Sequence, residues 1–280
     1  MGLGTSKIWV KNPKGILVPM TLDNQLKEAL DIAKLRVKKD WDYVSVIAGL
    51  PGGGKSTFAR NTLAKYCCPW FSDKYTAMTD KEFIHITKHC KNNSSVILDE
   101  SFASMNTKLV FSPEYIRVIN HLQIIRQKNL YLFLCLPNFF DLGKNIAIFR
   151  TSHLFVTYAQ EDGRRGYFLA FGREEKRKLY VKGAKYMDYY AEEPNFKGMF
   201  YKNAAVNDEE VYLKKKMDNL QERDRKVKIK GKDYYKNHEL MYNLREKEGW
   251  TQEKIGKLFG ITKQTVGQMI KDYLKYLEED

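Results

Sequence analysis

Short runs of consecutive apolar residues recur along the chain and predict the strands of an α/β protein. Such runs cover residues 43–48, 94–98 and 130–136. Strands of a parallel sheet have this composition because helices cover both faces of the sheet. Stretches in which apolar residues recur at helical spacing separate the runs, and this alternation predicts a parallel sheet. The run at 130–136 is the most apolar, so we expect its strand at the centre of the sheet.

The other elements of this part of the chain follow from turn signals, helix caps and helical spacing. Thr21 or Asp23 can cap a helix that runs to about Lys39, and Thr79 can cap a helix that begins at Asp80. The full set comprises two strands within 7–20, a strand at 74–78, helices that end near 39, 66, 90 and 128, and a hairpin with strands at 152–158 and 167–171.

A second pattern of apolar residues occupies the C-terminal end. Residues 238–248, 251–259 and 263–277 have helical spacing, and Gly260 with Ile261 makes a turn between the last two segments. This is the layout of a helix-turn-helix, in which the N-terminal residues of the last helix enter the major groove of DNA. A three-helix module that binds another protein would show the same spacing. The exposed side chains that could contact bases or phosphates are Lys263, Gln264, Thr265, Gln268 and Lys271.

A charged stretch separates the two patterned parts. Between residues 208 and 236 most positions are charged and apolar residues are sparse. Such a stretch is typical of a linker, and its basic residues could follow a phosphate backbone. We therefore divide the chain into an α/β domain at 1–200, a charged linker at 201–236 and a helix-turn-helix domain at 237–280.

The stretch from Gly49 to Thr57 carries a specific chemical signal. Its sequence, GLPGGGKST, follows a predicted strand and precedes a predicted helix, which is the context of a G-x-x-x-x-G-K-[ST] phosphate loop. Glycines let the backbone curl so that its N–H groups point at phosphate oxygens. We expect Lys55 to reach the β- and γ-phosphates and Ser56 to bind Mg²⁺. The predicted nucleotide-binding residues are Gly49, Pro51, Gly52, Gly53, Gly54, Lys55, Ser56 and Thr57.

Two carboxylates follow the predicted strand at 94–98. Ligands of open α/β sheets bind at the carboxyl ends of the strands, so we expect Asp99 and Glu100 beside the phosphate loop. Asp99 would complete the Mg²⁺ shell, and Glu100 would polarise the water that attacks the γ-phosphate. The sequence therefore predicts a site that binds ATP with Mg²⁺ and hydrolyses the ATP. GTP is the alternative nucleotide, although the chain lacks an N-K-x-D motif.

The excess of basic residues in the composition predicts a polyanionic partner. The chain of 280 residues holds 48 Lys and Arg against 34 Asp and Glu, a formal net charge of +14. An ATP site does not need this excess, so nucleic acid is the expected partner. No apolar run reaches the length of a membrane span, and the N-terminus lacks a signal-peptide core. The four cysteines show no paired spacing, which predicts reduced thiols in the cytoplasm.

Basic and aromatic residues are interleaved in and after the predicted hairpin. From Arg164 to Asp188 there are eight Lys and Arg against three acidic residues. Phosphates pair with basic side chains and bases stack on aromatic rings, so Arg164 and Arg165 at the hairpin tip are candidate DNA contacts. A solvated hairpin has the same composition, and both interpretations stay open.

Residues 42–160 resemble P-loop ATPases that carry a catalytic glutamate beside the Walker-B aspartate. Within that class, the segments LYLFLCLPN and IAIFRTSHLFV are similar to the FtsK/HerA group and to zonula-occludens-toxin-like phage proteins. The resemblance implies a RecA/ASCE-like core, a ring of subunits and an arginine that completes a neighbour's site. Arg150 is the first candidate for this arginine and Arg126 the second. The resemblance also implies a γ-phosphate sensor at Asn138, where the family often has glutamine, and a turn-forming role is the alternative.

Residues 238–275 resemble helix-turn-helix domains of the resolvase and sigma-factor type. Together the two resemblances imply an oligomeric phage or mobile-element ATPase in the cytoplasm of a bacterial or archaeal host. It would couple hydrolysis to translocation, packaging or assembly of DNA, most simply double-stranded DNA. A kinase of a nucleotide or small molecule is a second interpretation, and an ATP-liganded transcription regulator is a third. The arginines that could form a kinase lid are Arg164, Arg165, Arg173 and Arg177.

Overall fold

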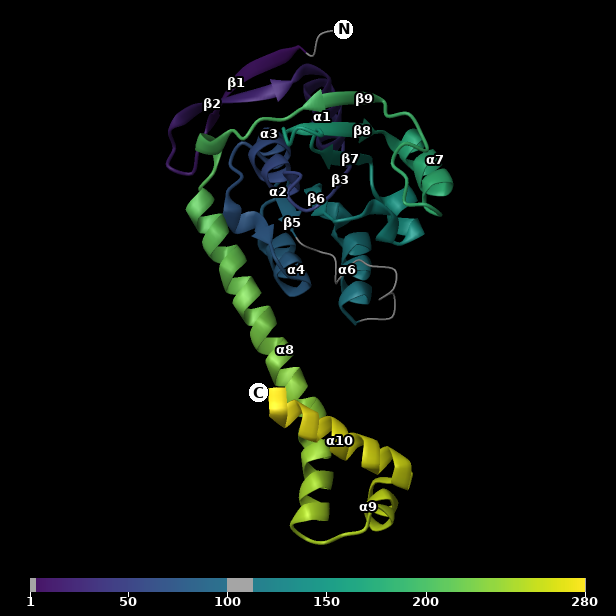
Figure 1. Ribbon diagram of the computed structural model, residues 1–280. Helices are drawn as coiled ribbons and strands as arrows, with labels where there is room; N and C mark the ends of the chain where they lie inside the picture. Colours follow the sequence, from purple (N-terminus) through teal and green to yellow (C-terminus); the bar gives the residue numbers. More distant parts are fainter. Residues whose placement is uncertain (1–3, 100–112, 280) are drawn as a thin grey trace. The chain divides into compact units, whose positions relative to one another are not determined.

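A seven-stranded sheet forms the centre of the larger part of the chain (Figure 1). The structure is a computed structural model that describes residues 4–99 and 113–279. The chain divides into two compact units, Met1–Lys215 and Lys216–Asp280. The strand order in the sheet is β4-β5-β6-β3-β7-β8-β9. The strands are β3 Tyr43–Ala48, β4 Thr76–Ala77, β5 Ser95–Leu98, β6 Tyr131–Cys135, β7 His153–Tyr158, β8 Tyr167–Phe171 and β9 Phe196–Met199.

The first five strands of this order are parallel, and only β8 and β9 pair antiparallel to their neighbours. The prediction of an α/β core with a mostly parallel sheet is confirmed. The apolar run at 130–136 forms β6, which lies inside the sheet between β5 and β3. The strand predicted at 74–78 is shorter than expected and lies at the edge as β4.

Strands β7 and β8 are the two strands of the predicted hairpin, and both lie within the central sheet. Strand β7 pairs parallel with β3, and β8 continues the same sheet to β9. The physical reason is burial, because most residues of both strands are apolar and are covered on both faces. This pairing also brings the end of β7 alongside the end of β3.

Helices cover both faces of the sheet because successive strand residues point to opposite sides. On β3, Tyr43 and Ile47 pack in the layer that contains α1, whereas Val44 and Val46 pack in the opposite layer. Helices α2 and α3 belong to the first layer, and α4, α6 and α7 supply the second. The helices of the first unit are α1 Asn24–Lys38, α2 Lys55–Phe58, α3 Lys65–Cys67, α4 Asp80–His89, α6 Pro113–Ile124 and α7 Arg173–Gly183.

Helix caps lie where the sequence predicted them. Two antiparallel strands, β1 Thr5–Lys11 and β2 Leu17–Asp23, precede α1. Asp23 rather than Thr21 caps α1, and its Oδ1 accepts a hydrogen bond of 3.1 Å from the Leu26 amide. Thr79 caps α4 by accepting from the Glu82 amide, while Glu82 reaches back to accept from the Met78 amide. Both caps satisfy amides that the first helical turn leaves without intrahelical partners.

The helix predicted at 58–66 contains an irregular segment. Residues Ala59–Ala64 form a π-helix between α2 and α3. The segment carries Arg60, whose side chain is only 1% exposed, and it is followed by Lys65, whose Nζ donates to the Phe71 carbonyl at 3.0 Å. π-Helical turns occur frequently at functional sites, and this one directly follows the predicted phosphate loop.

The second unit is built from helices around a small apolar core. Helices α9 Gln252–Phe259 and α10 Lys263–Glu279 follow the end of α8, as the apolar spacing predicts. The turn between α9 and α10 needs two glycines. Gly260 has φ +67°, and a Cβ on Gly256 would stand 2.6 Å from the Ile261 carbonyl oxygen. The core residues are Met241, Ile255, Val266 and Ile270.

Helix α8 occupies most of the stretch that we assigned to a charged linker. It runs from Glu209 to Glu246, so it begins in the first unit and ends in the second. The first unit extends to Lys215 rather than ending near residue 200, because the first turns of α8 pack on it. Tyr212, for example, is buried in the first unit. The charge count of the segment could not reveal these contacts because their partners lie far away in the sequence.

The structure gives the state of the four cysteines and the apolar length of the helices. Cys67, Cys68, Cys90 and Cys135 are free and buried. None of the helices in the described ranges is long and apolar enough to span a bilayer. Within the same ranges, no group of three or more His, Cys, Asp or Glu side chains is arranged to hold a metal ion.

His153 gives the first unit a predicted sensitivity to acid. Its ring packs against Tyr43 and Phe155, and its Nδ1 is buried with no hydrogen-bond partner in the described residues. Burial, followed by the charges of Arg36, Lys176 and Arg173, lowers the pKa of His153 to about 4. The unfolded chain therefore gains a proton near pH 6.5 that the folded chain takes up only near pH 4, so stability falls as the pH drops through this window.

We expect His153→Phe to remove this acid sensitivity. Between pH 7 and 4.5, the free energy of unfolding of the variant should fall by about 2–3 kcal/mol less than that of the wild type. Urea titrations of both proteins at the two pH values measure this difference. A stability difference between variant and wild type that is the same at both pH values would contradict the prediction.

Candidate active site

The loop from Gly49 to Gly54 joins β3 to α2 and is shaped by its glycines. Gly49, Gly52 and Gly54 have φ values of +139°, +77° and +88°, in a region that side chains other than glycine rarely adopt. A Cβ on Gly49 would stand 2.2 Å from the Thr157 carbonyl oxygen, and one on Gly54 would stand 2.8 Å from the Phe200 ring. Only glycine fits these positions, so the backbone forms the lining of the loop.

Lys55 lies against this loop. Its Nζ donates to the carbonyl oxygens of Gly49 and Leu50 at 2.7 and 2.9 Å. The ammonium group is therefore held at the loop by backbone acceptors. From this position a lysine can bind a phosphate that the loop cradles.

Ser56 and Asp99 meet although they follow different strands of the sheet. Asp99 directly follows β5 and is 2% exposed, and Ser56 lies in α2 after β3. The Ser56 hydroxyl donates to Asp99 Oδ1 at 3.0 Å. Parallel strands end at the same edge of the sheet, which explains why β3 and β5 bring these residues together across β6.

The pair fits a Mg²⁺ ion in its chemistry. A serine hydroxyl and a carboxylate are hard oxygen ligands, and Mg²⁺ is usually held by one or two protein oxygens together with substrate phosphates. Ser56 and Asp99 would hold the ion, and when bound it would offset the negative charge of the phosphates. The glycine-lined loop next to the pair provides a place for those phosphates.

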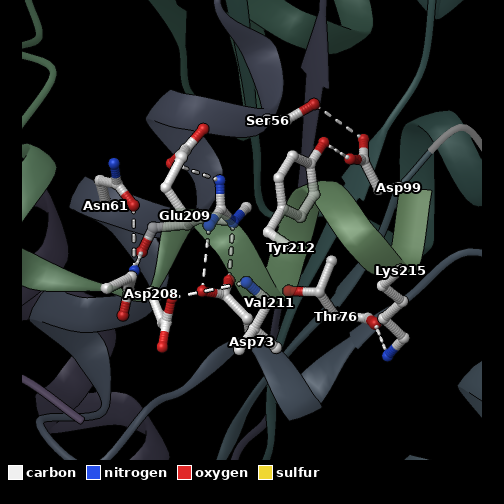
Figure 2. A network of polar contacts seen from close by, with 12 residues as sticks. Ser56, Asn61, Asp73, Thr76, Asp99, Asp208, Glu209, Val211, Tyr212 and Lys215 are labelled. Carbon is white, nitrogen blue, oxygen red and sulfur yellow. Dashed lines mark hydrogen bonds and ion pairs between the residues drawn. The ribbon is translucent and has the colours of Figure 1, made fainter. Parts of the chain in front are cut away.

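Tyr212 is a site residue that the sequence did not reveal. Its hydroxyl donates to Asp99 Oδ2 at 2.6 Å, so both oxygens of Asp99 are engaged (Figure 2). Burial and the neighbouring Asp99 raise the pKa of Tyr212, which keeps the hydroxyl protonated as a donor. An aromatic residue within a charged segment is a weak signal of burial, and it does not identify a partner 113 positions away.

Arg60 ties the start of α8 to the rest of the unit. Its Nε and Nη2 donate to the two oxygens of Asp73 at 2.6 and 3.0 Å, and its Nη1 donates to Glu209 at 3.3 Å. The guanidinium carbon also lies 3.6 Å from the centre of the Tyr212 ring. One turn further along α8, Lys215 donates to the Thr76 carbonyl (Figure 2). These contacts hold Tyr212 beside Asp99.

Replacing Tyr212 by phenylalanine should weaken this arrangement without removing it. We expect Tyr212→Phe to lower the free energy of unfolding by about 1.5–3 kcal/mol, because a hydrogen bond to a charged group is lost. Urea denaturation followed by circular dichroism measures the change. Tyr190→Phe is the matched control, since Tyr190 is 80% exposed. Equal stability of Tyr212→Phe and the wild type would show that the hydrogen bond contributes nothing.

Glu100 and Asn138 are two further residues that the sequence predicts to be catalytic. Glu100 lies outside the described residues, so its role stays a prediction. Asn138 lies at the start of a short 3-10 helix, and its role as a sensor stays a prediction. Its Oδ1 accepts from the Phe140 amide at 3.3 Å and from the Tyr189 hydroxyl at 3.0 Å.

Arg150 and Arg126 lie far from the phosphate loop of their own chain. Arg150 pairs with Asp42, which precedes β3, and donates to the Leu122 carbonyl at 2.9 Å. The Arg126 guanidinium stands 5.4 Å from the centre of the Trp41 ring. Both arginines are therefore near the amino end of β3, whereas the loop follows its carboxyl end. A role of either in a neighbouring subunit stays a prediction.

The two hairpin arginines differ in their surroundings. Arg164 is 68% exposed and its Nε pairs with Asp162 at 2.6 Å. Arg165 is also exposed, but its guanidinium lies 3.8–4.0 Å from the point where a Cβ on Gly52 would stand. The structure thus brings Arg165, predicted as a DNA contact, to the phosphate loop.

The residues predicted to read DNA are exposed in the first turns of α10. Lys263 pairs with Glu253 at 3.2 Å, and the amide nitrogen of Gln268 donates to Asp272 at 2.8 Å. These contacts join exposed partners and can be exchanged for water or phosphate. The exposed set comprises Lys263, Gln264, Thr265, Gln268 and Lys271. Their DNA contacts stay a prediction.

The comparisons match this chain to solved structures. No protein-family model matches the chain, and no curated protein matches it. Among solved structures, the genome packaging NTPase B204 from Sulfolobus turreted icosahedral virus 2, in complex with ATP-gammaS, is similar at a TM-score of 0.35 and 14% identity. That match covers 48% of this chain and 94% of the other.

A second similar structure is the N-terminal domain of zonular occludens toxin from Neisseria meningitidis. Its TM-score is 0.37 at 15% identity, and the match covers 57% of this chain and 94% of the other. Likenesses of this size do not establish a shared activity, so the functional argument depends on the site itself.

Proposed function

We propose that this chain is an ATPase that binds ATP with Mg²⁺ at residues 49–57 and acts on DNA. The main observation in support of this proposal is the hydrogen bond between Ser56 and Asp99, which lies beside the glycine loop and Lys55. A phosphate cradle, a cation and a pair of metal-binding oxygens are the parts that phosphoryl transfer from a nucleoside triphosphate requires. We further propose a RecA/ASCE-like core and a ring of subunits, as the sequence resemblance implies.

Each residue has a defined part in this proposal. The loop amides bind the phosphates, and Lys55 leaves its backbone acceptors to bind the β- and γ-phosphates. Ser56 and Asp99 hold Mg²⁺, with Asp99 fixed by Tyr212. Glu100, which follows Asp99 in the sequence, orients the attacking water. Stabilisation of the charge that develops on the phosphates would be the main catalytic effect.

The proposed DNA interaction is supported by charge and by the second unit. The net charge of +14 favours a polyanion, and α10 presents polar and basic side chains at its exposed start. We propose that hydrolysis is coupled to translocation, packaging or assembly of double-stranded DNA by an oligomeric phage or mobile-element protein. The place of action would be the cytoplasm of the host cell.

The test is ATP hydrolysis by the purified full chain in the presence and absence of double-stranded and single-stranded DNA. Stimulation by DNA is the expected result, and the more effective form identifies the substrate. Hydrolysis that is unaffected by either DNA would contradict the coupling. Glu100→Gln tests the water-orienting role, because unchanged turnover in this variant would remove Glu100 from the site.

A kinase is the second candidate, and the position of Arg165 favours it. An arginine above a phosphate loop would suit a lid that closes over a phosphate donor. Transfer of phosphate from ATP to an added nucleoside or sugar, with little release of free phosphate, would support the kinase. An ATP-liganded transcription regulator would instead bind ATP without turnover.

A further inference from the structure

The end of β7 lies directly against the phosphate loop. Strand β7 pairs parallel with β3, with Val156 opposite Ala48, so both strands end at the same edge. A Cβ on Gly53 would stand 3.1 Å from the Thr157 hydroxyl oxygen. The connection between β7 and β8 therefore starts at the loop that we propose binds phosphates.

The β7–β8 connection has a defined turn. The Gly163 amide donates to the Gln160 carbonyl and the Gln160 amide donates to the Arg164 carbonyl, both at 2.9 Å. At its far end, Gly166 has φ +101° and its carbonyl accepts from the Phe200 amide at 2.7 Å. These hydrogen bonds fix the backbone on both sides of Arg165.

Phe200 ties the same turn to the loop. Its backbone holds Gly166, and its ring lies so close to Gly54 that a Cβ there would be 2.8 Å away. The Phe200 ring also stacks on Phe58, with the ring centres 4.6 Å apart. Because Gly166 follows Arg165 in the chain, this packing sets the position of Arg165 relative to Gly54.

Arg165 and Arg164 are neighbours with different partners. Arg164 is neutralised locally by Asp162. The guanidinium of Arg165 instead lies beside Gly52, and no ion pair of Arg165 is found within the described residues. Arg165 and Lys55 thus place two cations at one glycine loop, and each would be stabilised by a bound polyphosphate.

We propose that Arg165 binds the phosphates of the nucleotide in its own chain. The proposal rests on the nucleotide site proposed above and replaces the expectation that Arg165 contacts DNA. A guanidinium can donate two hydrogen bonds to phosphate oxygens and can stabilise the charge that develops there during transfer. Arg126 and Arg150 lie near the other end of β3, so they cannot take this part within the same chain.

The test compares Arg165→Ala with Arg164→Ala in the full chain. Both variants remove one positive charge from adjacent positions, so general electrostatic effects are matched. Binding of ATP, ADP and AMP in the presence of Mg²⁺ is measured by displacement of a fluorescent nucleotide. We expect Arg165→Ala to weaken ATP binding about 10- to 100-fold and AMP binding much less. Arg164→Ala should change ATP binding less than about twofold.

A conservative variant and a rate measurement distinguish a direct contact of Arg165 with the phosphates from an effect of the substitution on the folding of the hairpin. Arg165→Lys keeps the charge but loses the planar fork, so its ATP affinity should lie between those of Arg165→Ala and the wild type. In the proposed hydrolysis, Arg165→Ala should lower kcat as well as raise KM. Unchanged thermal unfolding of the variants shows that the hairpin remains folded.

Three results would overturn the inference. Equal loss of ATP affinity in Arg164→Ala and Arg165→Ala would assign the effect to general charge. Loss of DNA binding with intact ATP affinity in Arg165→Ala would return the residue to its DNA role. ATP affinity unchanged in Arg165→Ala but weakened in Lys55→Ala would refute this inference alone. If neither the wild type nor Lys55→Ala binds ATP, the nucleotide site itself is refuted.

Discussion

Replacing Lys55 by alanine should reduce ATP hydrolysis on the order of 10²- to 10³-fold, the size of effect seen when one preorganised donor is removed from developing charge. Lys55 lies on the glycine loop, where its Nζ donates to the carbonyls of Gly49 and Leu50. The loop would still bind phosphates through its amides in the variant, but the charge at the transferred group would lack its lysine. Release of inorganic phosphate from ATP measures the rate.

Lys91→Ala is the matched control for Lys55→Ala. Lys91 is exposed between α4 and β5, so its removal lowers the net charge equally without touching the loop. The control should hydrolyse ATP at the wild-type rate. A Lys55→Ala protein that retains the wild-type rate would place the hydrolysis elsewhere or in a contaminating enzyme.

The largest loss of stability is expected from Arg60→Ala. The side chains of Arg60 and Asp73 are each 1% exposed, and they share two hydrogen bonds of 2.6 and 3.0 Å. Truncation of Arg60 leaves the Asp73 carboxylate buried without this partner, which costs about 3–5 kcal/mol. At roughly 2–4 °C per kcal/mol for a unit of this size, Tm should fall by roughly 6–20 °C. Calorimetry or circular dichroism measures the change.

Glu209→Gln should lose much less stability than Arg60→Ala. Glu209 also pairs with Arg60, at 3.3 Å, but its side chain is 43% exposed. Water screens such a pair, so the variant should lose less than about 1 kcal/mol. A replacement of both partners, Arg60→Met with Asp73→Leu, should be far less damaging than Arg60→Ala because no buried charge remains. A double variant as unstable as Arg60→Ala would contradict this explanation.

The local chemistry of the loop could be predicted from the sequence because it depends on neighbouring residues. The glycines at 49, 52 and 54 occupy backbone conformations that other residues rarely adopt, and their spacing in the motif predicts the loop. Asp99 could be placed because a residue after a parallel strand lies at the edge where ligands bind. Helix caps are local as well: Thr79 caps its helix as predicted, and Asp23 is one of the two residues predicted to cap the first helix.

The contacts that the sequence missed depend on which distant elements become neighbours. Tyr212 meets Asp99, and Glu209 meets Arg60, only because α8 begins on the first unit. We assigned this segment to a linker because most of its residues are charged and few are apolar. The position of Arg165 depends on β7 lying next to β3, and apolar runs predict strands without their order.

The hydrogen bonds within the site also bear on the rate of the proposed ATPase cycle. Lys55 donates to backbone carbonyls, and Ser56 donates to Asp99. In the proposed function, a nucleotide would exchange these hydrogen bonds for new ones, which would lower the net gain from binding. The same internal partners receive Lys55 and Ser56 again when the product leaves. For the proposed ATPase, we therefore expect moderate nucleotide affinity and ready product release, and both would favour repeated turnover over tight storage of a nucleotide.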